Sequence, residues 1–203
     1  MKIILTSMLI ALTTISFTTN AQKVKLTKGN LAFLKTEKVT TVEFSYDGAV
    51  VGKKDENDYV TKKAAEYNKK EPGTGDKWVI AWNKDKTDRF PAKFIQLYNE
   101  NVEGSGCSKI EQNTTSKYKM IVKTTYMNPG YNVGISRAAA VCNYTIQFVE
   151  TANPSNVVAE VTITGSTGQT FGGFDFETGV RLGESYALAG KSLGKFVKKM
   201  ANK

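Results

Sequence analysis

The amino-acid sequence predicts an α+β fold in which an antiparallel sheet of about four strands packs against helices, the last of them long. Two observations lead to this prediction. From Lys117 onward, apolar residues recur at every second position, which is the period of a strand with one buried face. Before and after that segment, apolar residues recur every three to four positions, as they do in helices that pack on a sheet.

The first 21 residues predict an export signal. A basic residue precedes an apolar run over 3–12, and small and polar residues follow, so we expect cleavage between Ala21 and Gln22. The alternative, a transmembrane anchor, needs roughly 20 apolar residues, more than this run has. Residues 22–36 are polar and lysine-rich, and we interpret them as a leader; 37–203 then form a single α+β domain. The predicted location is the periplasm or the exterior, with a peripheral position at the outer membrane left open.

The first half of the expected domain combines one strand with helices. Residues 38–46 are β-branched and aromatic and end at an Asp-Gly turn, which predicts the first strand. A helix is predicted from its cap at Asp55 up to the Pro-Gly pair at 72–73. Residues 78–82 fit a short helix or a buried strand about equally. A clearer helix follows over about 88–102, with a proline in its first turn.

The second half predicts a meander and a terminal helix. Alternating segments over 117–126, 141–150 and 157–163 are joined by short turns, which favours consecutive antiparallel strands. A glycine-rich segment, 165–173, leads into the last helix, over about 175–200. Glycine costs about 1 kcal/mol relative to alanine within a helix, so we expect the small residues there to permit a close approach to the sheet. These residues are Gly179, Gly183, Ala187, Gly190 and Gly194.

The chain has no histidine, and this excludes several kinds of site. A Ser-His-Asp triad, a Cys-His pair, an HExxH zinc site and a histidine-ligated haem all need an imidazole. The carboxylates Asp175, Glu177 and Glu184 lie near the start of the last helix, but Glu177 is expected to form an i, i+4 ion pair with Arg181. We therefore predict no catalytic residue, no metal site, no cofactor and no enzymatic activity.

Two groups of residues remain as candidates. Cys107 and Cys142 are the only cysteines, and the sequence leaves open whether they form a disulfide or are free thiols. The net charge of +9 favours polyanionic partners, or simply solubility. Lys117, Lys119 and Lys123 would form a polyanion-binding face if no helix covers that side of the sheet. Aromatic residues do not interleave with them, so nucleic acid is not a predicted partner.

The second half of the sequence is similar to a known group of envelope domains. The stretches 126–132, 144–150 and 157–160, the glycine connection and the terminal helix resemble the periplasmic α/β domains of the curli-secretion-channel and penicillin-binding-protein-activator lipoprotein superfamily. The resemblance covers 117–199 and implies a sheet packed on helices, with a role in envelope assembly or regulation. The chain lacks a lipid-accepting cysteine after its signal and long alternating hairpins, so channel formation is not implied. No catalytic residue is implied either.

These observations predict an exported cell-envelope protein that acts by binding, as an accessory or assembly factor. Its expected partner is another envelope protein or a cell-wall or surface polymer. The alternatives are a polyanion-binding module and a His-free hydrolase built on Asp175 and Glu184 or on a Ser-Lys pair. No segment after the signal approaches the length of a membrane span, and the oligomeric state is left open.

Overall fold

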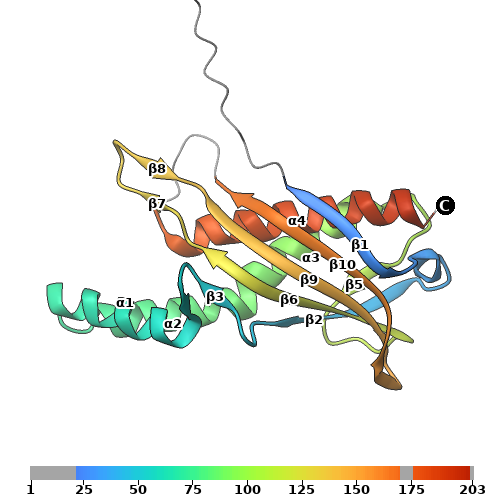
Figure 1. The fold of residues 1–203 in the computed structure, drawn as a ribbon, viewed down its shortest axis with the longest axis horizontal. Coiled ribbons are helices and arrows are strands. Elements are labelled where there is room, and N and C mark those ends of the chain that lie inside the picture. The colour runs from blue at the N-terminus through green and yellow to red at the C-terminus, as the bar shows by residue number, and fades with distance from the viewer. Residues whose placement is uncertain (1–21, 170–175, 202–203) are drawn as a thin grey trace, which may run out of the picture.

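A mixed β-sheet forms the centre of the molecule in the computed structural model, which describes residues 22–169 and 176–201 (Figure 1). Its strands are β1 (Lys23–Gly29), β2 (Val39–Ser45), β3 (Val50–Val51), β4 (Lys54–Asp55), β5 (Lys109–Glu111), β6 (Tyr118–Asn128), β9 (Ala140–Glu150) and β10 (Asn153–Gly168). The order is β1-β10-β9-β6-β2-β5, with β3 pairing both β6 and β4.

The predicted antiparallel sheet of about four strands is therefore wrong, although the α+β composition and the long C-terminal helix are present. The described sheet has eight strands, and β2 runs parallel to both β6 and β5, as β3 does to β6. Parallel neighbours need a long crossover connection, which the helical segment between β2 and β5 supplies. The local alternation of residues could not reveal this pairing.

The predicted meander is confirmed, since β6 pairs with β9 and β9 with β10, both antiparallel. A register shift between Thr124 and Tyr126 changes which residues face the core. Met127 is fully buried in place of Tyr126, which was expected on the inner face. A small separate hairpin, β7 (Tyr131–Asn132) with β8 (Arg137–Ala138), connects β6 to β9.

Residues 22–36, predicted as a polar leader, instead contain β1 and a short 3₁₀ helix, η1 (Ala32–Lys35). Strand β1 forms one edge of the sheet by pairing with β10. Its alternate residues Val24 and Leu26 pack against the core, and its lysines, Lys23, Lys25 and Lys28, are exposed. Two apolar positions were too few for the strand period to stand out among so many lysines.

The helical segment begins with α1 (Glu56–Lys70), capped as predicted by the Asp55 carboxylate, which accepts a hydrogen bond from the Asp58 N–H at 2.9 Å. Helix α2 (Thr74–Lys84) contains Trp78 and Trp82, so this segment is helical and not a strand. Helix α3 (Phe90–Val102) follows through a π-helical turn, η2 (Asp85–Arg89).

The π-helical turn ends at Arg89, two residues before Pro91. A proline inside a helix lacks an N–H donor, and its ring clashes with the carbonyl four residues earlier, so a wider turn relieves the contact. The Phe90 N–H accordingly bonds to the Asp85 carbonyl, five residues back. The Lys86 carbonyl accepts a bond from the Tyr46 hydroxyl at 2.9 Å. The helical run from α2 to α3 thus continues without a break. The wider turn rotates the side chains of α3 about the helix axis relative to those of α2.

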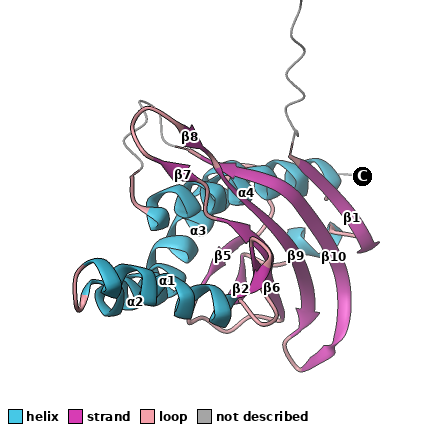
Figure 2. Cartoon of the chain, turned by 60° about the vertical axis from the view of Figure 1, so that its left-hand side comes forward, coloured by secondary structure: helices cyan, strands magenta, loops and turns pink. Residues whose placement is uncertain are grey.

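The terminal helix, α4 (Thr178–Met200), lies beside α3 on one face of the sheet (Figures 1 and 2). Its glycines make room for α3 and η2, and not for the sheet as predicted. A Cβ on Gly190 would lie 2.2 Å from the Phe94 carbonyl oxygen, and one on Gly194 2.8 Å from that of Tyr98. The predicted cost of these glycines is thus offset by close packing between two helices.

The core lies between this helical layer and the inner face of the sheet. Met120, Val122, Ile146 and Phe148 are fully buried there. Polar groups in this layer are paired across it: the Tyr186 hydroxyl bonds to Thr124 at 2.6 Å, and the Tyr144 hydroxyl to Ser185 at 3.3 Å. Among the described residues, no helix covers the opposite face of the sheet (Figure 2).

Candidate functional site

Both cysteines are free and buried in the described structure. Cys107 lies in the loop after α3, and Cys142 lies on the inner face of β9. Burial raises the pKa of the Cys142 thiol to about 11, so this thiol stays protonated and poorly nucleophilic at neutral pH.

The carboxylates near the start of α4 have partners other than those predicted. Glu177 lies 3.8 Å from the Arg89 guanidinium, and Glu184 lies 2.9 Å from a lysine of α3. The expected pair between Glu177 and Arg181 is wrong, because Glu177 turns toward Arg89 on the neighbouring helix. Asp175 lies outside the described residues, so the hydrolase alternative built on it stays untested.

The predicted polyanion face lies on the side of the sheet that no described helix covers. Lys119 and Lys123 project from it along β6, and Lys117 immediately precedes that strand. The Lys119 ammonium lies 2.6 Å from the Glu43 carboxylate on β2, and the Lys117 ammonium lies 5.2 Å from the centre of the Tyr118 ring.

Strand β1 extends this face with lysines that sequence reasoning missed. The register places Lys25, Thr162, Thr145 and Lys123 in one row across β1, β10, β9 and β6. Three strand spacings, about 14 Å, separate the two lysines of that row. Glu160 on β10 accepts bonds from Gln147 and Thr27, both at 2.9 Å, and these bonds lower the pKa of its carboxyl. The face is therefore basic at β1 and β6, with one acidic group on β10 and one on β2 that is paired with Lys119.

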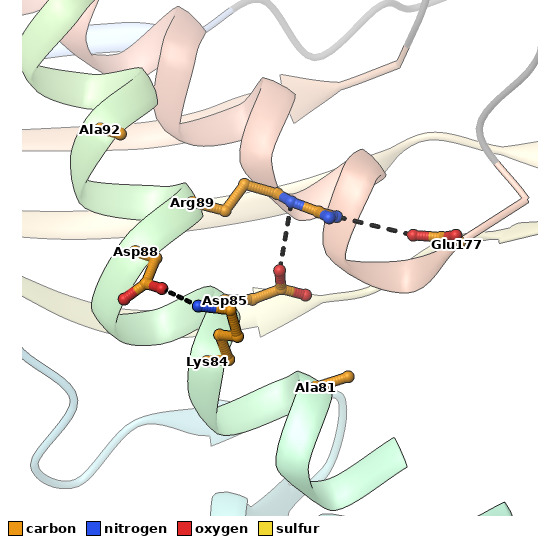
Figure 3. Close-up of a pocket in the computed structure, with 7 residues that line it drawn as sticks. All are labelled: Ala81, Lys84, Asp85, Asp88, Arg89, Ala92 and Glu177. Atoms are coloured by element: carbon orange, nitrogen blue, oxygen red, sulfur yellow. Dashed lines mark hydrogen bonds and ion pairs between the residues drawn. The ribbon is translucent and has the colours of Figure 1, made fainter. Parts of the chain in front are cut away.

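A second candidate site surrounds the π-helical turn. A hollow of about 490 Å³ lies between the helical run α2–η2–α3 and the start of α4. Figure 3 shows Arg89 reaching from the helix toward Glu177, with Asp85 beside it. The hollow is lined by Ala81, Lys84, Asp85, Asp88, Arg89, Ala92 and Glu177.

The charged groups of this hollow are largely compensated by one another. Arg89 Nε lies 3.1 Å from Asp85 Oδ1, its Nη1 lies 3.8 Å from Glu177, and Lys84 pairs with Asp88. Burial, and after it the charges of Glu177 and Asp88, raise the pKa of Asp85 despite the opposing charge of Arg89. Within the described part of the chain, the buried Nη1 of Arg89 has no hydrogen-bond acceptor. The site therefore holds an unused donor and a carboxylate that is costly to ionise.

Gly179, at the start of α4, is required for this arrangement. A Cβ there would lie 1.7 Å from Asp85 Oδ2 and 2.9 Å from Arg89 Nη1. The missing side chain allows the first turn of α4 to approach the carboxylate and the guanidinium directly. This glycine was recognised in the sequence, but the charged partners on η2 were not.

An aromatic groove of about 300 Å³ adjoins the charged hollow and shares Ala81, Asp85 and Glu177 with it. Tyr67, Trp78, Trp82 and Phe176 contribute its rings. Trp78 packs 5.3 Å from Trp82 and 5.8 Å from Tyr67, between ring centres. Phe176 is 60% exposed. The two hollows together, here called the Asp85 site, place aromatic rings next to hydrogen-bonding groups.

The chemistry available at the Asp85 site is binding through rings, carboxylates and a guanidinium. No group of three or more metal-ligating side chains that could hold an ion occurs among residues 22–169 and 176–201. Asp85 and Arg89 were not predicted, because neither belongs to a recognisable motif. Their i, i+4 spacing, followed by a proline inside a helical pattern, was the available signal.

Comparisons with known proteins find two similar solved structures at low sequence identity. No family model and no curated protein match this chain. Among solved structures, a PelC dodecamer from Paraburkholderia phytofirmans is 13% identical over 88% of this chain and 98% of that one, with a TM-score of 0.43. A second PelC dodecamer from the same organism is 15% identical over 86% and 96%, with a TM-score of 0.39. Separately, the described part contains no helix that is both long and apolar enough to span a bilayer.

Proposed function

We propose that the protein is an exported envelope protein that binds a saccharide of the cell wall or of a surface polymer at the Asp85 site, without catalysis. The observation that carries the proposal is the contact between the aromatic groove and the charged hollow, which share Asp85 and Glu177. The predicted export signal and the resemblance to envelope-assembly domains support the location.

A saccharide fits both halves of the site. The C–H faces of sugar rings pack against aromatic rings, and sugar hydroxyls donate to carboxylates and accept from a guanidinium. The unused Nη1 of Arg89 is such a donor. Since Lys84 is paired with Asp88, and Arg89 with two carboxylates, a neutral sugar suits the site better than a polyanion does.

The chain's own fluorescence provides the test. Trp78 and Trp82 are its only tryptophans, and both line the aromatic groove. Titration with soluble oligomers of N-acetylglucosamine or of glucose is expected to change the emission in a saturable way. Glu177→Gln and Arg89→Gln are each expected to weaken binding about tenfold, equivalent to about 1.4 kcal/mol.

The matched control is Ile80→Ser on α2. Ile80 is 69% exposed and does not line either hollow, so binding should be unchanged. An unchanged emission with both oligomer series would contradict the proposal. Shortening of the oligomers that is abolished by Asp85→Asn would instead show a hydrolase and remove the claim of binding without catalysis.

A second candidate function, polyanion binding, is favoured by the row that holds Lys25 and Lys123 at opposite ends of two threonines. Binding of dextran sulfate should then weaken steeply with salt, and Lys25→Gln with Lys123→Gln should reduce the salt slope by roughly two counterions. The control, Lys69→Gln with Lys70→Gln on α1, removes the same charge elsewhere. Equal slopes for both double variants would assign the effect to net charge and sink this function.

A further inference from the structure

The β7–β8 hairpin carries an apolar tip away from the main sheet. Its two strands pair only with one another in the described structure, between the ends of β6 and β9 (Figure 1). The tip is internally ordered: the Val133 N–H donates to the Ser136 carbonyl, and the Gly134 N–H to the Asn132 side chain, both at 3.0 Å. Gly134 has a φ of +81°, which the turn requires.

The apolar residues of this tip are unusually exposed. Ile135 is fully exposed at 101%, Val133 is 66% exposed and Tyr131 is 47% exposed. Single exposed apolar side chains are common, but three within five consecutive residues form a local apolar surface. The hydrogen bonds of the tip fix its conformation without these three side chains. Their exposure to water therefore contributes nothing to the stability of the fold.

The residues around the tip indicate what covers it. Tyr131 places a ring with a polar hydroxyl at its base, and Arg137 on β8 adds an exposed positive charge. Phe176 lies at the same end, because the Arg181 guanidinium bonds to both the Phe176 and Pro129 carbonyls, at 2.9 and 3.0 Å. Aliphatic residues at the extremity with aromatic and basic residues behind them are typical of proteins that insert shallowly into a bilayer.

The size and charge of the tip favour a lipid surface over a protein. A stable protein interface needs about 20–30 residues on each side, and an eight-residue hairpin offers far fewer. The chain carries a net charge of +9, which attracts anionic lipid headgroups. The exposed Lys53 lies at the same end of β6, because the preceding Gly52 N–H bonds to the Met127 carbonyl at 2.8 Å.

The described chain also begins at this end. The Gln22 side chain donates to Ser166 at 3.1 Å, and Ser166 pairs with Cys142 near the start of β9. The 21 residues before Gln22 include the apolar run of the predicted export signal. Gln22, the first described residue, therefore lies at the end of the sheet that carries the hairpin.

We propose that the β7–β8 hairpin inserts Val133 and Ile135 into the interfacial layer of an anionic phospholipid bilayer and holds the protein peripherally there. This proposal does not depend on the saccharide site. The inserted side chains supply the apolar contact, while Arg137 and Lys53 contact headgroup phosphates. The binding is reversible, because a tip this small buries little apolar surface.

Flotation with lipid vesicles tests the proposal on the processed protein, whose N-terminus is checked by mass spectrometry. We expect binding to vesicles of phosphatidylethanolamine and phosphatidylglycerol. The double variant Val133→Ser with Ile135→Ser should lose about tenfold or more of its partition coefficient. The matched control Ile80→Ser, an exposed apolar residue on α2, should bind as the parent does.

Site-specific labelling provides a second measurement. Both native cysteines are buried, so an environment-sensitive fluorophore attaches selectively to Ile135→Cys or to the control Ile80→Cys. The label at position 135 should shift to the blue with vesicles, and the label at position 80 should not.

Three results would overturn the proposal. The first is equal flotation of the tip double variant and the parent. The second is loss of flotation in Lys25→Gln with Lys123→Gln while the tip variant still binds, which would assign lipid binding to the open face. The third is that the parent forms an oligomer, the tip double variant is monomeric, and neither binds vesicles. The tip would then contact a second copy of the chain.

Discussion

The two faces of the sheet come from the same strands but obey different constraints. Ile146 on β9 faces the helices and is fully buried, whereas its neighbour Thr145 lies on the uncovered face between Thr162 and Lys123. The inner face is fixed by packing against α4 and by paired hydroxyls. The outer face has only to remain compatible with water. Substitutions at adjacent residues of one strand can therefore test the stability of the fold and the role of the outer face separately.

Adjacent substitutions on β9 should give the largest contrast. Ile146→Ala removes buried methyl groups and leaves a cavity, and should lower the free energy of unfolding by about 2–5 kcal/mol. Thr145→Ala, one residue away, should lower it by less than about 1 kcal/mol, since it loses only a cross-strand contact. Urea unfolding followed by circular dichroism measures both. Equal losses would show that the outer face is also packed, for instance by another chain.

Substitutions at two glycines of α4 test how closely α4 packs against α3 in the helical layer. Alanine is the better helix former by about 1 kcal/mol, yet a Cβ on Gly190 meets the Phe94 backbone at 2.2 Å. We expect Gly190→Ala to lower the free energy of unfolding by about 2 kcal/mol through separation of α3 and α4.

Gly183 is the matched position for this prediction. A Cβ there would lie 3.2 Å from Cδ of Arg89, part of a flexible side chain that can move. Gly183→Ala should therefore stay within about 1 kcal/mol of the parent. If Gly190→Ala were as stable as Gly183→Ala in urea, the close approach of the two helices would be wrong.

The same contrast explains what the sequence could predict. Alternation over 117–163 gave three strands correctly, because one buried face imposes a period of two. Strand β1 was missed because only Val24 and Leu26 face inward, among lysines that resemble a linker. Strands β2 and β6 pair in parallel although the whole helical segment separates them in the sequence. The local periodicity of apolar residues carries no information about such distant pairing.

The candidate site was less predictable than the fold. The predicted lysines do lie on an uncovered face, but Lys25, at the other end of their row, became visible only once β1 was placed in the sheet. Asp85 and Glu177 are distant in sequence, and they meet because a π-helical turn and a glycine bring two helices together. Neither feature has a sequence motif, although Pro91 within a helical pattern marks the place.

The smallest expected effect concerns Asp85 and has a defined sign. Burial raises the pKa of Asp85 in the folded state. An acid with a raised folded pKa contributes stability below its unfolded pKa, and that contribution is lost as pH rises through the folded pKa. At pH 7, Asp85→Asn should therefore raise the free energy of unfolding by only a few tenths of a kcal/mol, because the site is partly open to solvent. The gain should vanish below about pH 4.

Asp88 lines the same hollow and provides the opposite case. The Lys84 hydrogen bond holds the pKa of the Asp88 carboxyl below its ordinary value, so its contribution to stability is present at neutral pH and is lost on acidification. Asp88→Asn should slightly destabilise the protein at pH 7, the reverse of Asp85→Asn. Urea unfolding from pH 3 to pH 7 compares the two. Opposite signs would mark Asp85 as a carboxylate kept at a cost to folding, as expected of a ligand-binding group, whereas equal signs would make both ordinary surface charges.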